Sequence, residues 1–395
     1  HRRQYTPIGT TLPHAPASKA TAADRLPELQ EIWDKSPNAR RAKASTSATN
    51  RVSINNPNTG VSPGDPVVEV GAKSTLKKGQ RVVVPFIISC GCCFFCDKQQ
   101  FSACENSNPA ETSDLSETPM GHPMGAAFGF AHLTGGYAGG QAEYVRVPFS
   151  DIGPIVIPDG VDDDKVLFLS DILPTGWMAA ENAGIEPGDI VAVWGCGPVG
   201  LFAVQSAFLM GAERVIAIDH FPARLALAAK FGAETLNFED SQVYQSLMEM
   251  TGGIGPDAVI DCVGLEAHGV SFDNILDTVK VKVGLGTDRI HAIRQAIFAC
   301  RKGGRVSMPA VYGGYVDKFP LGAFMEKGLT LKTGQTHVQH YMPALLNAIM
   351  EDKIETTFMI SHRMPLEEAP AGYKLFHDHQ NEATKIVLKT ETIFA

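Results

Sequence analysis

The sequence is short of positive charge. Its 395 residues contain 34 Lys and Arg but 43 Asp and Glu, which gives a formal net charge of −9. Proteins that bind nucleic acid use clustered Lys and Arg to contact phosphates, so this balance argues against nucleic acid as the main partner. The deficit is uneven, because residues 1–60 carry nine basic and four acidic residues, a net charge of +5, and the remainder carries −14.

The sequence also lacks a visible secretory hydrophobic segment, an internal repeat and a convincing membrane span. Residues 190–212 contain no charged residue over 23 positions, which is nominally long enough to cross a bilayer. However, Gly195, Gly197, Pro198 and Gly200 interrupt this stretch, and its two halves are strand-like and helix-like. We therefore expect a cytoplasmic protein of about two domains with no membrane partner.

The first sixty residues show little hydrophobic periodicity and are rich in Ala, Ser, Thr, Pro and Asn. A short exception is the segment in which Leu26, Leu29 and Trp33 could share one face of a helix capped by Asp24. Residues 1–23 contain Arg, Ser and Thr but no acidic residue, a composition that faintly resembles a transit peptide. A poorly ordered arm is the interpretation that we favour.

Two hydrophobic patterns divide the rest of the chain. From about Val67, β-branched runs bounded by Gly, Pro and Lys predict an all-β region: PVVEVG, QRVVVPFII and QAEYVRVP. From residue 190, strand-like and helix-like segments alternate: IVAVWG, VGLFAVQSAFLMGA, RVIAID, PARLALAAKFGA, DAVIDCVG, RIHAIRQAIFACRK and RVSMPA. This alternation predicts an α/β fold with a doubly wound parallel sheet. The last sixty residues are expected to form one helix and short strands.

A glycine pattern follows the first of these strands. Gly195, Gly197 and Gly200 have G-x-G-x-x-G spacing, and the next helix opens at Pro198 and Val199. In a strand–turn–helix context the first glycine makes the tight turn, the second lets the backbone approach a pyrophosphate, and the third allows close packing. The pyrophosphate would lie at the helix N-terminus, where unpaired N–H groups favour negative charge. The pattern predicts a nicotinamide dinucleotide site.

A carboxylate at the end of the next strand indicates which dinucleotide binds. Asp219 follows Gly200 by 19 residues, where a carboxylate can accept hydrogen bonds from both ribose hydroxyls. It would repel a 2′-phosphate, so we expect NAD rather than NADP. Asp219 could also serve as a helix N-cap ahead of Pro222. Arg224 is a further candidate for cofactor binding, although a solvated helix residue is the commoner role.

Five of the eight cysteines lie within residues 90–104. Four of them, Cys90, Cys93, Cys96 and Cys104, have the spacing C-x2-C-x2-C-x7-C, which suits a structural zinc ion held by four thiolates. Cys92 lies outside this pattern. A disulfide framework is the alternative, but it is typical of short secreted chains rather than of a chain this long. We expect the thiols to hold a loop in shape and not to take part in a reaction.

Four longer phrases resemble one known family: LSDILPTGWMAA, HLTGGYAGGQAEYVRVP, ACRKGGRVS and LTLKTGQTHVQHYMP. Together with the cysteine loop and the glycine pattern, they resemble the zinc-dependent medium-chain alcohol dehydrogenases, in the branch of the glutathione-independent formaldehyde dehydrogenases. The resemblance covers roughly residues 67–390. It implies a GroES-like β-barrel catalytic domain over 61–182 and 335–395 and a Rossmann NAD-binding domain over 183–334. Residues 1–60 would be an atypical arm.

The resemblance also implies an activity. Members of this family transfer hydride between NAD and a small alcohol or aldehyde at a catalytic zinc ion, and commonly form homodimers or homotetramers. In this branch the catalytic zinc is bound by Cys, His and Asp, and Asp171 matches the Asp. Thr175 matches a residue near the nicotinamide. Three further residues match positions around the cofactor: Val263, His268 and Gln335.

The other two ligands of the catalytic zinc have no match. No cysteine precedes Cys90, and the only earlier histidines are His1 and His14. The chain passes from Gly64-Asp65 directly to Val67, where the family has a G-H-E motif in between. A single carboxylate binds zinc poorly, so we expect one zinc ion per chain rather than two.

Three residues of ligand type are spare: Cys92, His122 and His132. We interpret the two histidines as local structure. A second hypothesis is therefore a non-catalytic NAD-binding relative that keeps only the structural zinc. A third explanation is a mis-joined exon or a frameshift upstream of residue 66.

Overall fold

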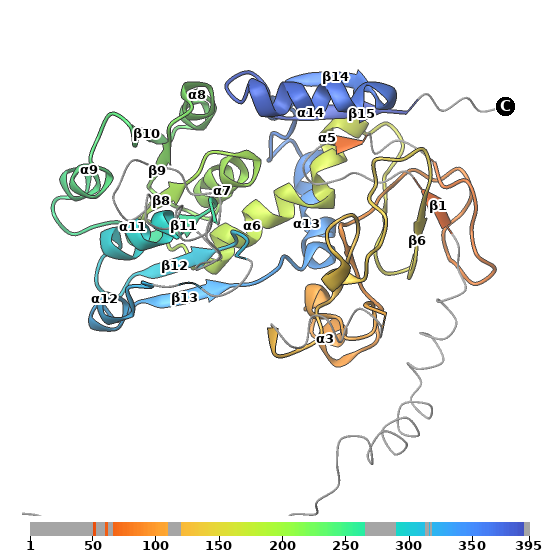
Figure 1. The fold of residues 1–395 in the computed structure, drawn as a ribbon, viewed down its shortest axis with the longest axis horizontal. Coiled ribbons are helices and arrows are strands. Elements are labelled where there is room, and N and C mark those ends of the chain that lie inside the picture. Colours follow the sequence, from red (N-terminus) through yellow and green to blue (C-terminus); the bar gives the residue numbers. More distant parts are fainter. Residues whose placement is uncertain are drawn as a thin grey trace, which may run out of the picture.

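The computed structural model describes residues 50–52, 60–61, 66–109, 120–264, 290–312, 316 and 318–390. The expected helix at Leu26–Trp33, the segment that resembles a transit peptide and His268 lie outside these residues. Figure 1 shows a sheet covered by helices on one side of the molecule and a set of short strands on the other. Two helices, Ile172–Asn182 (α6) and Val338–Met350 (α13), run between these two parts.

The larger sheet has six parallel strands in the order β10-β9-β8-β11-β12-β13. Their bounds are Ile190–Trp194 (β8), Arg214–Asp219 (β9), Glu234–Asn237 (β10), Ala258–Asp261 (β11), Arg305–Met308 (β12) and Thr330–Thr333 (β13). The strand order reverses between β8 and β11, so ligands are expected at the carboxyl ends of these two strands. The predicted Rossmann sheet is confirmed.

Helices cover both faces of this sheet: Pro198–Leu209 (α7), Pro222–Lys230 (α8), Val243–Met250 (α9), His291–Ala299 (α11) and Leu321–Glu326 (α12). Alternate residues of β8 belong to two different cores. Val193 packs in a cluster with α7, whereas Ala192 packs in a cluster with α9 and α11. Because both faces are buried, the strands read as nearly continuous apolar runs.

The second part contains the short strands that the β-branched runs predict. Val82–Val83 (β3) pairs with Ile155–Val156 (β7), and Ile87–Ile88 (β4) pairs with Ala126–Ala127 (β5). Two other strands pair across longer sequence distances. Asn50–Val52 (β1), from the arm expected over residues 1–60, pairs antiparallel with Val145–Val147 (β6). Gly60–Val61 (β2) pairs with Ile386–Lys389 (β15), which also pairs with His362–Pro365 (β14).

The C-terminal region has two helices of eight or more residues, Val338–Met350 (α13) and Ala369–Asp378 (α14), so the expectation of one helix was wrong. Proline and glycine in the sequence APAG suggest a turn. The proline lies in the first turn of α14, where its missing N–H costs nothing. At Gly372, an added Cβ would lie 3.4 Å from the sulfur of Met364, so this face of the helix packs against β14.

The helix α6 contacts both parts of the molecule. Ile172–Asn182 (α6) packs against both α7 and α13. At Gly176 an added Cβ would lie 2.5 Å from the Cβ of Phe202, so glycine allows α6 and α7 to approach closely. In the described part of the chain, no helix is both long and apolar enough to span a bilayer.

Candidate metal centres and cofactor edge

The four cysteines of the C-x2-C-x2-C-x7-C pattern come together. Their sulfur atoms all lie within 4.8 Å of one another, and all four residues are buried. The sulfurs of Cys90 and Cys96 are 4.0 Å apart. Zinc–sulfur bonds of about 2.3 Å in a tetrahedron place sulfurs about 3.8 Å apart, so this group fits a zinc ion. The eight cysteines are all free thiols, so the disulfide alternative is wrong.

Local backbone geometry folds this loop around the sulfurs. Gly91 has a φ of +75°, and an added Cβ would lie 2.4 Å from the side chain of Ile152. The backbone N–H of Cys90 donates to the sulfur of Cys104 at 3.2 Å. A short helix, Phe94–Asp97 (α3), then carries Cys96 inward. Backbone N–H groups that point at sulfur stabilise thiolates, which are the form that binds zinc.

Cys92 is buried beside this group but is not part of it. Its thiol donates to the sulfur of Cys90 at 3.7 Å. Burial raises the pKa of Cys92 to about 12, with a further contribution from the charge of Cys90. Cys92 is therefore a neutral hydrogen-bond donor to the metal-binding group, which agrees with its exclusion from the spacing.

Asp171 lies at the junction between the short helix Leu167–Ser170 (η3) and α6. The Thr175 hydroxyl donates to its Oδ1 at 3.0 Å, and the Thr336 hydroxyl donates to Thr175 Oγ1 at 2.9 Å. This chain of hydrogen bonds connects α6 with the loop that precedes α13. The structure therefore brings together the two residues expected at the catalytic centre, Asp171 and Thr175.

The surroundings of Asp171 do not fit a zinc ion. In the described ranges, the four-cysteine group is the only cluster of three or more potential ligands. The charge that acts on Asp171 is the buried ammonium of Lys385, which would repel a divalent cation. Burial raises the pKa of Asp171 to about 6 and lowers that of Lys385 to about 8. His122 and His132 are both exposed, and His122 contacts the carbonyl of Pro123.

The glycine pattern forms the turn between β8 and α7. Gly195 has a φ of +87°, and a Cβ added at Gly200 would lie 1.8 Å from the carbonyl oxygen of Gly195. Gly197, in contrast, has no heavy atom within 4 Å of an added Cβ. It is the N-cap of α7 and gives the helix no side-chain cap, and Pro198 and Val199 follow it. The open space and the uncapped N–H groups suit a pyrophosphate.

Asp219 is tied to this turn by its own side chain. It is 5% exposed, and its Oδ2 accepts a hydrogen bond from the backbone N–H of Cys196 at 2.7 Å. Its Oδ1 accepts from His220 and Phe221, at 2.7 and 3.0 Å. The N-cap of α8 is Phe221, so the N-cap alternative for Asp219 is wrong. The guanidinium of Arg224 lies over the Phe221 ring at 4.3 Å.

The two remaining cofactor candidates, Val263 and Gln335, lie in different parts of the structure. A Cβ on Gly195 would approach Val263 Cγ2 to 2.9 Å, so Val263 packs directly on the glycine turn. Gln335 lines a cavity of about 240 Å³ with His337 and His340. The sequence interpretation did not find Thr336, Lys385 or the Asp261–Tyr312 pair described below, because no motif marks them and their contacts form only in the folded chain.

Comparisons with known proteins match both parts of the chain. A family model described as an alcohol dehydrogenase GroES-like domain matches residues 59–159, and a zinc-binding dehydrogenase model matches residues 198–287. The zinc-type alcohol dehydrogenase-like protein AdhB of Bacillus subtilis is 42% identical over 328 residues, which covers 82% of each chain. The glutathione-independent formaldehyde dehydrogenase of the same organism is 35% identical and covers 78% of this chain and 74% of its own.

Among solved structures, the alcohol dehydrogenase TADH from Thermus sp. ATN1 superposes with a TM-score of 0.67 at 33% identity. The match covers 83% of this chain and 82% of that one. The resemblance on which the sequence interpretation relied is therefore confirmed, and so is the combination of a GroES-like domain with a Rossmann-like sheet.

Proposed function

The chain belongs to the zinc-containing medium-chain alcohol dehydrogenase family, and from this premise we propose that it binds NAD and transfers hydride between NAD and a small alcohol or aldehyde. The observation that carries the proposal is the turn after β8. It combines an uncapped helix N-terminus with open space at Gly197 and a closed contact at Gly200. The open space at Gly197 leaves room for a pyrophosphate, whereas a turn that served only for packing would not need that space.

Formaldehyde or a chemically similar compound is the proposed substrate. Support comes from the relative named glutathione-independent formaldehyde dehydrogenase, which is 35% identical to this chain. We further propose that residues 61–182 and 335–395 form the catalytic domain, that residues 183–334 bind NAD, and that the protein is a cytoplasmic homodimer or homotetramer.

NAD would supply the acceptor for the hydride, and the residues of this chain would bind and orient it. The α7 N-terminus and Gly197 would bind the pyrophosphate, and Asp219 would accept from a ribose hydroxyl with the lone pair that its three backbone bonds leave on Oδ2. Val263 would lie against the cofactor beside Gly195. Two further cofactor candidates are Arg224, in the first turn of the helix after Asp219, and His268, which is proposed on the resemblance alone.

The Thr175 hydroxyl would orient groups near the nicotinamide, because it is held between Asp171 and Thr336. Its hydrogen bond to Oδ1 also fixes the position of the Asp171 carboxylate. Gln335, which directly precedes Thr336 in the same loop, would contact the cofactor beside them. These contacts position side chains, but they supply no electrophile for the carbonyl or hydroxyl oxygen of a substrate.

The residues of this chain fit one of the two zinc sites that the family implies and do not fit the other. Cys90, Cys93, Cys96 and Cys104 would hold a zinc ion that stabilises the loop. The catalytic zinc that the family implies does not fit Asp171 and Lys385, so we derive no step through it. That mismatch favours the second candidate function, an NAD-binding relative with very slow turnover.

Calorimetric titration with NAD and NADP, together with zinc analysis of dialysed protein, tests these assignments. We expect one NAD site per chain, weaker binding of NADP and about one zinc ion per chain. The fluorescence of Trp194, which directly precedes Gly195, offers a second readout of binding. Absence of NAD binding would overturn the proposed function, and a zinc content near two would show that another group of ligands completes the second site.

A further inference from the structure

The turn after β11 forms part of the cofactor edge. β8 and β11 are neighbours in the sheet, and Asp261 is paired with Trp194 at their carboxyl ends. The N–H of Cys262 then donates to the carbonyl of Trp194 at 2.9 Å. The next residue, Val263, packs on Gly195 of the glycine turn. The position of residues 262–264 therefore affects the space available to a ligand at this edge.

A buried carboxylate holds this turn in place. Asp261 is the last residue of β11 and is 0% exposed. Its Oδ1 accepts hydrogen bonds from the backbone N–H groups of Val263 and Gly264, at 2.9 and 3.4 Å. Gly264 has a φ of +68°, and an added Cβ would lie 2.7 Å from the carbonyl oxygen of Val311. The turn is thus fixed between its own carboxylate and the segment that follows β12.

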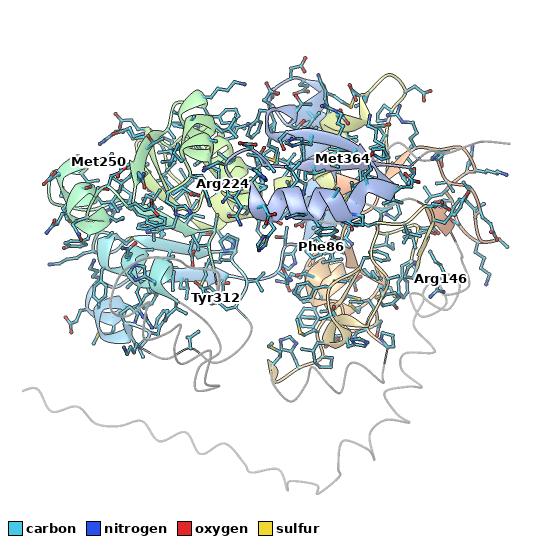
Figure 2. All side chains as sticks on the ribbon, turned by 45° about the horizontal axis from the view of Figure 1, so that its top comes forward. Phe86, Arg146, Arg224, Met250, Tyr312 and Met364 are labelled. Atoms are coloured by element: carbon cyan, nitrogen blue, oxygen red, sulfur yellow. The ribbon has the colours of Figure 1, made fainter. Side chains whose placement is uncertain are left out.

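Tyr312 binds the second oxygen of the Asp261 carboxylate. Its hydroxyl donates to Oδ2 of Asp261 at 2.6 Å, so one carboxylate joins the carboxyl ends of β11 and β12. Figure 2 shows Tyr312 near the end of the sheet from which the chain continues toward α13. Short hydrogen bonds to a buried charged acceptor are among the stronger ones in proteins, because the carboxylate has no water to replace a lost donor.

The strand order indicates which half of a dinucleotide this turn would face. Asp219 ends β9, on one side of the point where the order reverses, and β11 and β12 lie on the other side. A dinucleotide that crosses this point places one nucleotide on each side. If Asp219 binds the adenosine ribose, the 262–264 turn faces the nicotinamide half.

We propose that Asp261 and Tyr312 form a clamp that positions the 262–264 turn for the nicotinamide half of NAD. Neither residue would touch the reacting atoms, so both are positioning residues. The inference rests on the proposed NAD site. It adds a determinant of cofactor binding that lies outside the glycine pattern and outside the residues implied by the family resemblance.

Tyr312→Phe removes only the hydroxyl group. We expect it to weaken NAD binding about tenfold, because the turn loses one of the hydrogen bonds that hold it. Binding of ADP-ribose, which lacks nicotinamide, should change less than twofold. Both ligands are titrated calorimetrically into the same preparation of full-length protein. Loss of folded protein would lower the number of sites for both ligands and leave the ratio of their dissociation constants unchanged. Asp261→Asn, which keeps the size of the side chain, should shift that ratio in the same direction.

Tyr373→Phe is a matched control. Tyr373 lies on α14, away from the glycine turn, and its hydroxyl donates to the side-chain oxygen of Gln141 at 2.7 Å. This variant should leave both affinities unchanged. Equal weakening of NAD and ADP-ribose in Tyr312→Phe, or no weakening of either, would overturn the clamp. Absence of NAD binding by the unsubstituted protein would overturn the NAD assignment itself, and the clamp with it.

Discussion

The four-cysteine loop and the Asp171 centre both contain residue types that bind zinc, but their ligands are distributed along the chain in different ways. In the loop, all four sulfurs come from residues 90–104 and lie within 4.8 Å of one another. At the other centre, Asp171 would need partners from the region upstream of Val67, where the sequence has no cysteine and only two histidines, His1 and His14. A local site is complete whenever its own segment folds, whereas a distributed site depends on every segment that contributes to it.

The buried Lys385 is a second difference between the two centres. The loop contains no cationic side chain among its buried residues, so its thiolates can be neutralised by a metal ion. At the other centre, the charge of a buried lysine already acts on Asp171. The anionic ligands in the two places therefore have different counterions: a metal ion would neutralise the thiolates, whereas the Lys385 ammonium acts on the Asp171 carboxylate.

The largest expected effect comes from supplying the missing ligands. Replacing residues 1–66 with a family-like segment that carries C-G-S-D and G-H-E motifs, together with Lys385→Met to remove the ammonium beside Asp171, should raise NAD-dependent turnover of short alcohols by about 1000-fold or more. Zinc in an open site lowers the pKa of bound water from about 15.7 to about 7, and each unit corresponds to about 1.4 kcal/mol. Zinc content should rise by about one ion per chain.

In that chimera, Asp171→Ala should return turnover to the level of the unmodified chain. The unmodified chain itself should show little activity on formaldehyde or short alcohols, with or without added zinc. Vigorous, chelator-sensitive turnover by the unmodified chain would mean that the Asp171 centre does hold a zinc ion. It would point to His122 or His132 as a substitute ligand.

The next largest effect concerns the loop. Cys96→Ser should abolish stoichiometric zinc binding, because one of four ligands is lost from a closed tetrahedral site. Cys92→Ser should leave the zinc content unchanged, since that thiol only donates a hydrogen bond to Cys90. Elemental analysis after dialysis measures both. Equal zinc loss in the two variants would mean that Cys92 is a ligand.

The glycine turn offers a comparison within a few residues. Gly200→Ala should lower the free energy of unfolding by about 3 kcal/mol, because the new methyl group would clash with the Gly195 carbonyl. Gly197→Ala has open space and should cost less than about 1 kcal/mol. It should nevertheless weaken NAD binding, because the methyl group would occupy space left for the pyrophosphate. Urea unfolding and calorimetry separate the two effects. If the two variants lost similar amounts of unfolding free energy, the assignment of Gly197 to ligand binding would be contradicted.

The smallest effect is expected at Asp219. Asp219→Asn should reduce the preference for NAD over NADP about tenfold, because an uncharged side chain no longer repels a 2′-phosphate. Asparagine keeps an acceptor for the N–H of Cys196, so the turn should survive better than it would in Asp219→Gly. Asp240→Asn, in a surface loop after β10, is the control and should leave the preference unchanged. An equal preference in all three proteins would remove Asp219 from the cofactor site.

Much of this arrangement could be predicted because the signals are local. The strand, turn and helix around Gly195–Gly200 follow from hydrophobic period and glycine spacing, and the cysteine loop follows from four positions in fifteen residues. The α14 helix was missed because its Pro and Gly read as a turn, although the proline is in the first helical turn and Gly372 meets β14. A local pattern cannot show that a glycine lies on the face of a helix that packs against a strand.

The amino-acid sequence by itself determined the Rossmann sheet, the glycine turn, the four-cysteine loop and the membership of a dehydrogenase family, because each depends on residues that are close together in the chain. Only the tertiary structure decided the charge beside Asp171, the backbone bonds of Asp219 and the Asp261–Tyr312 pair. Lys385 lies 214 positions after Asp171, and Tyr312 lies 51 after Asp261. Burial removes water from such distant partners and makes their charges and hydrogen bonds strong, and no spacing in the sequence records which residues will be buried together.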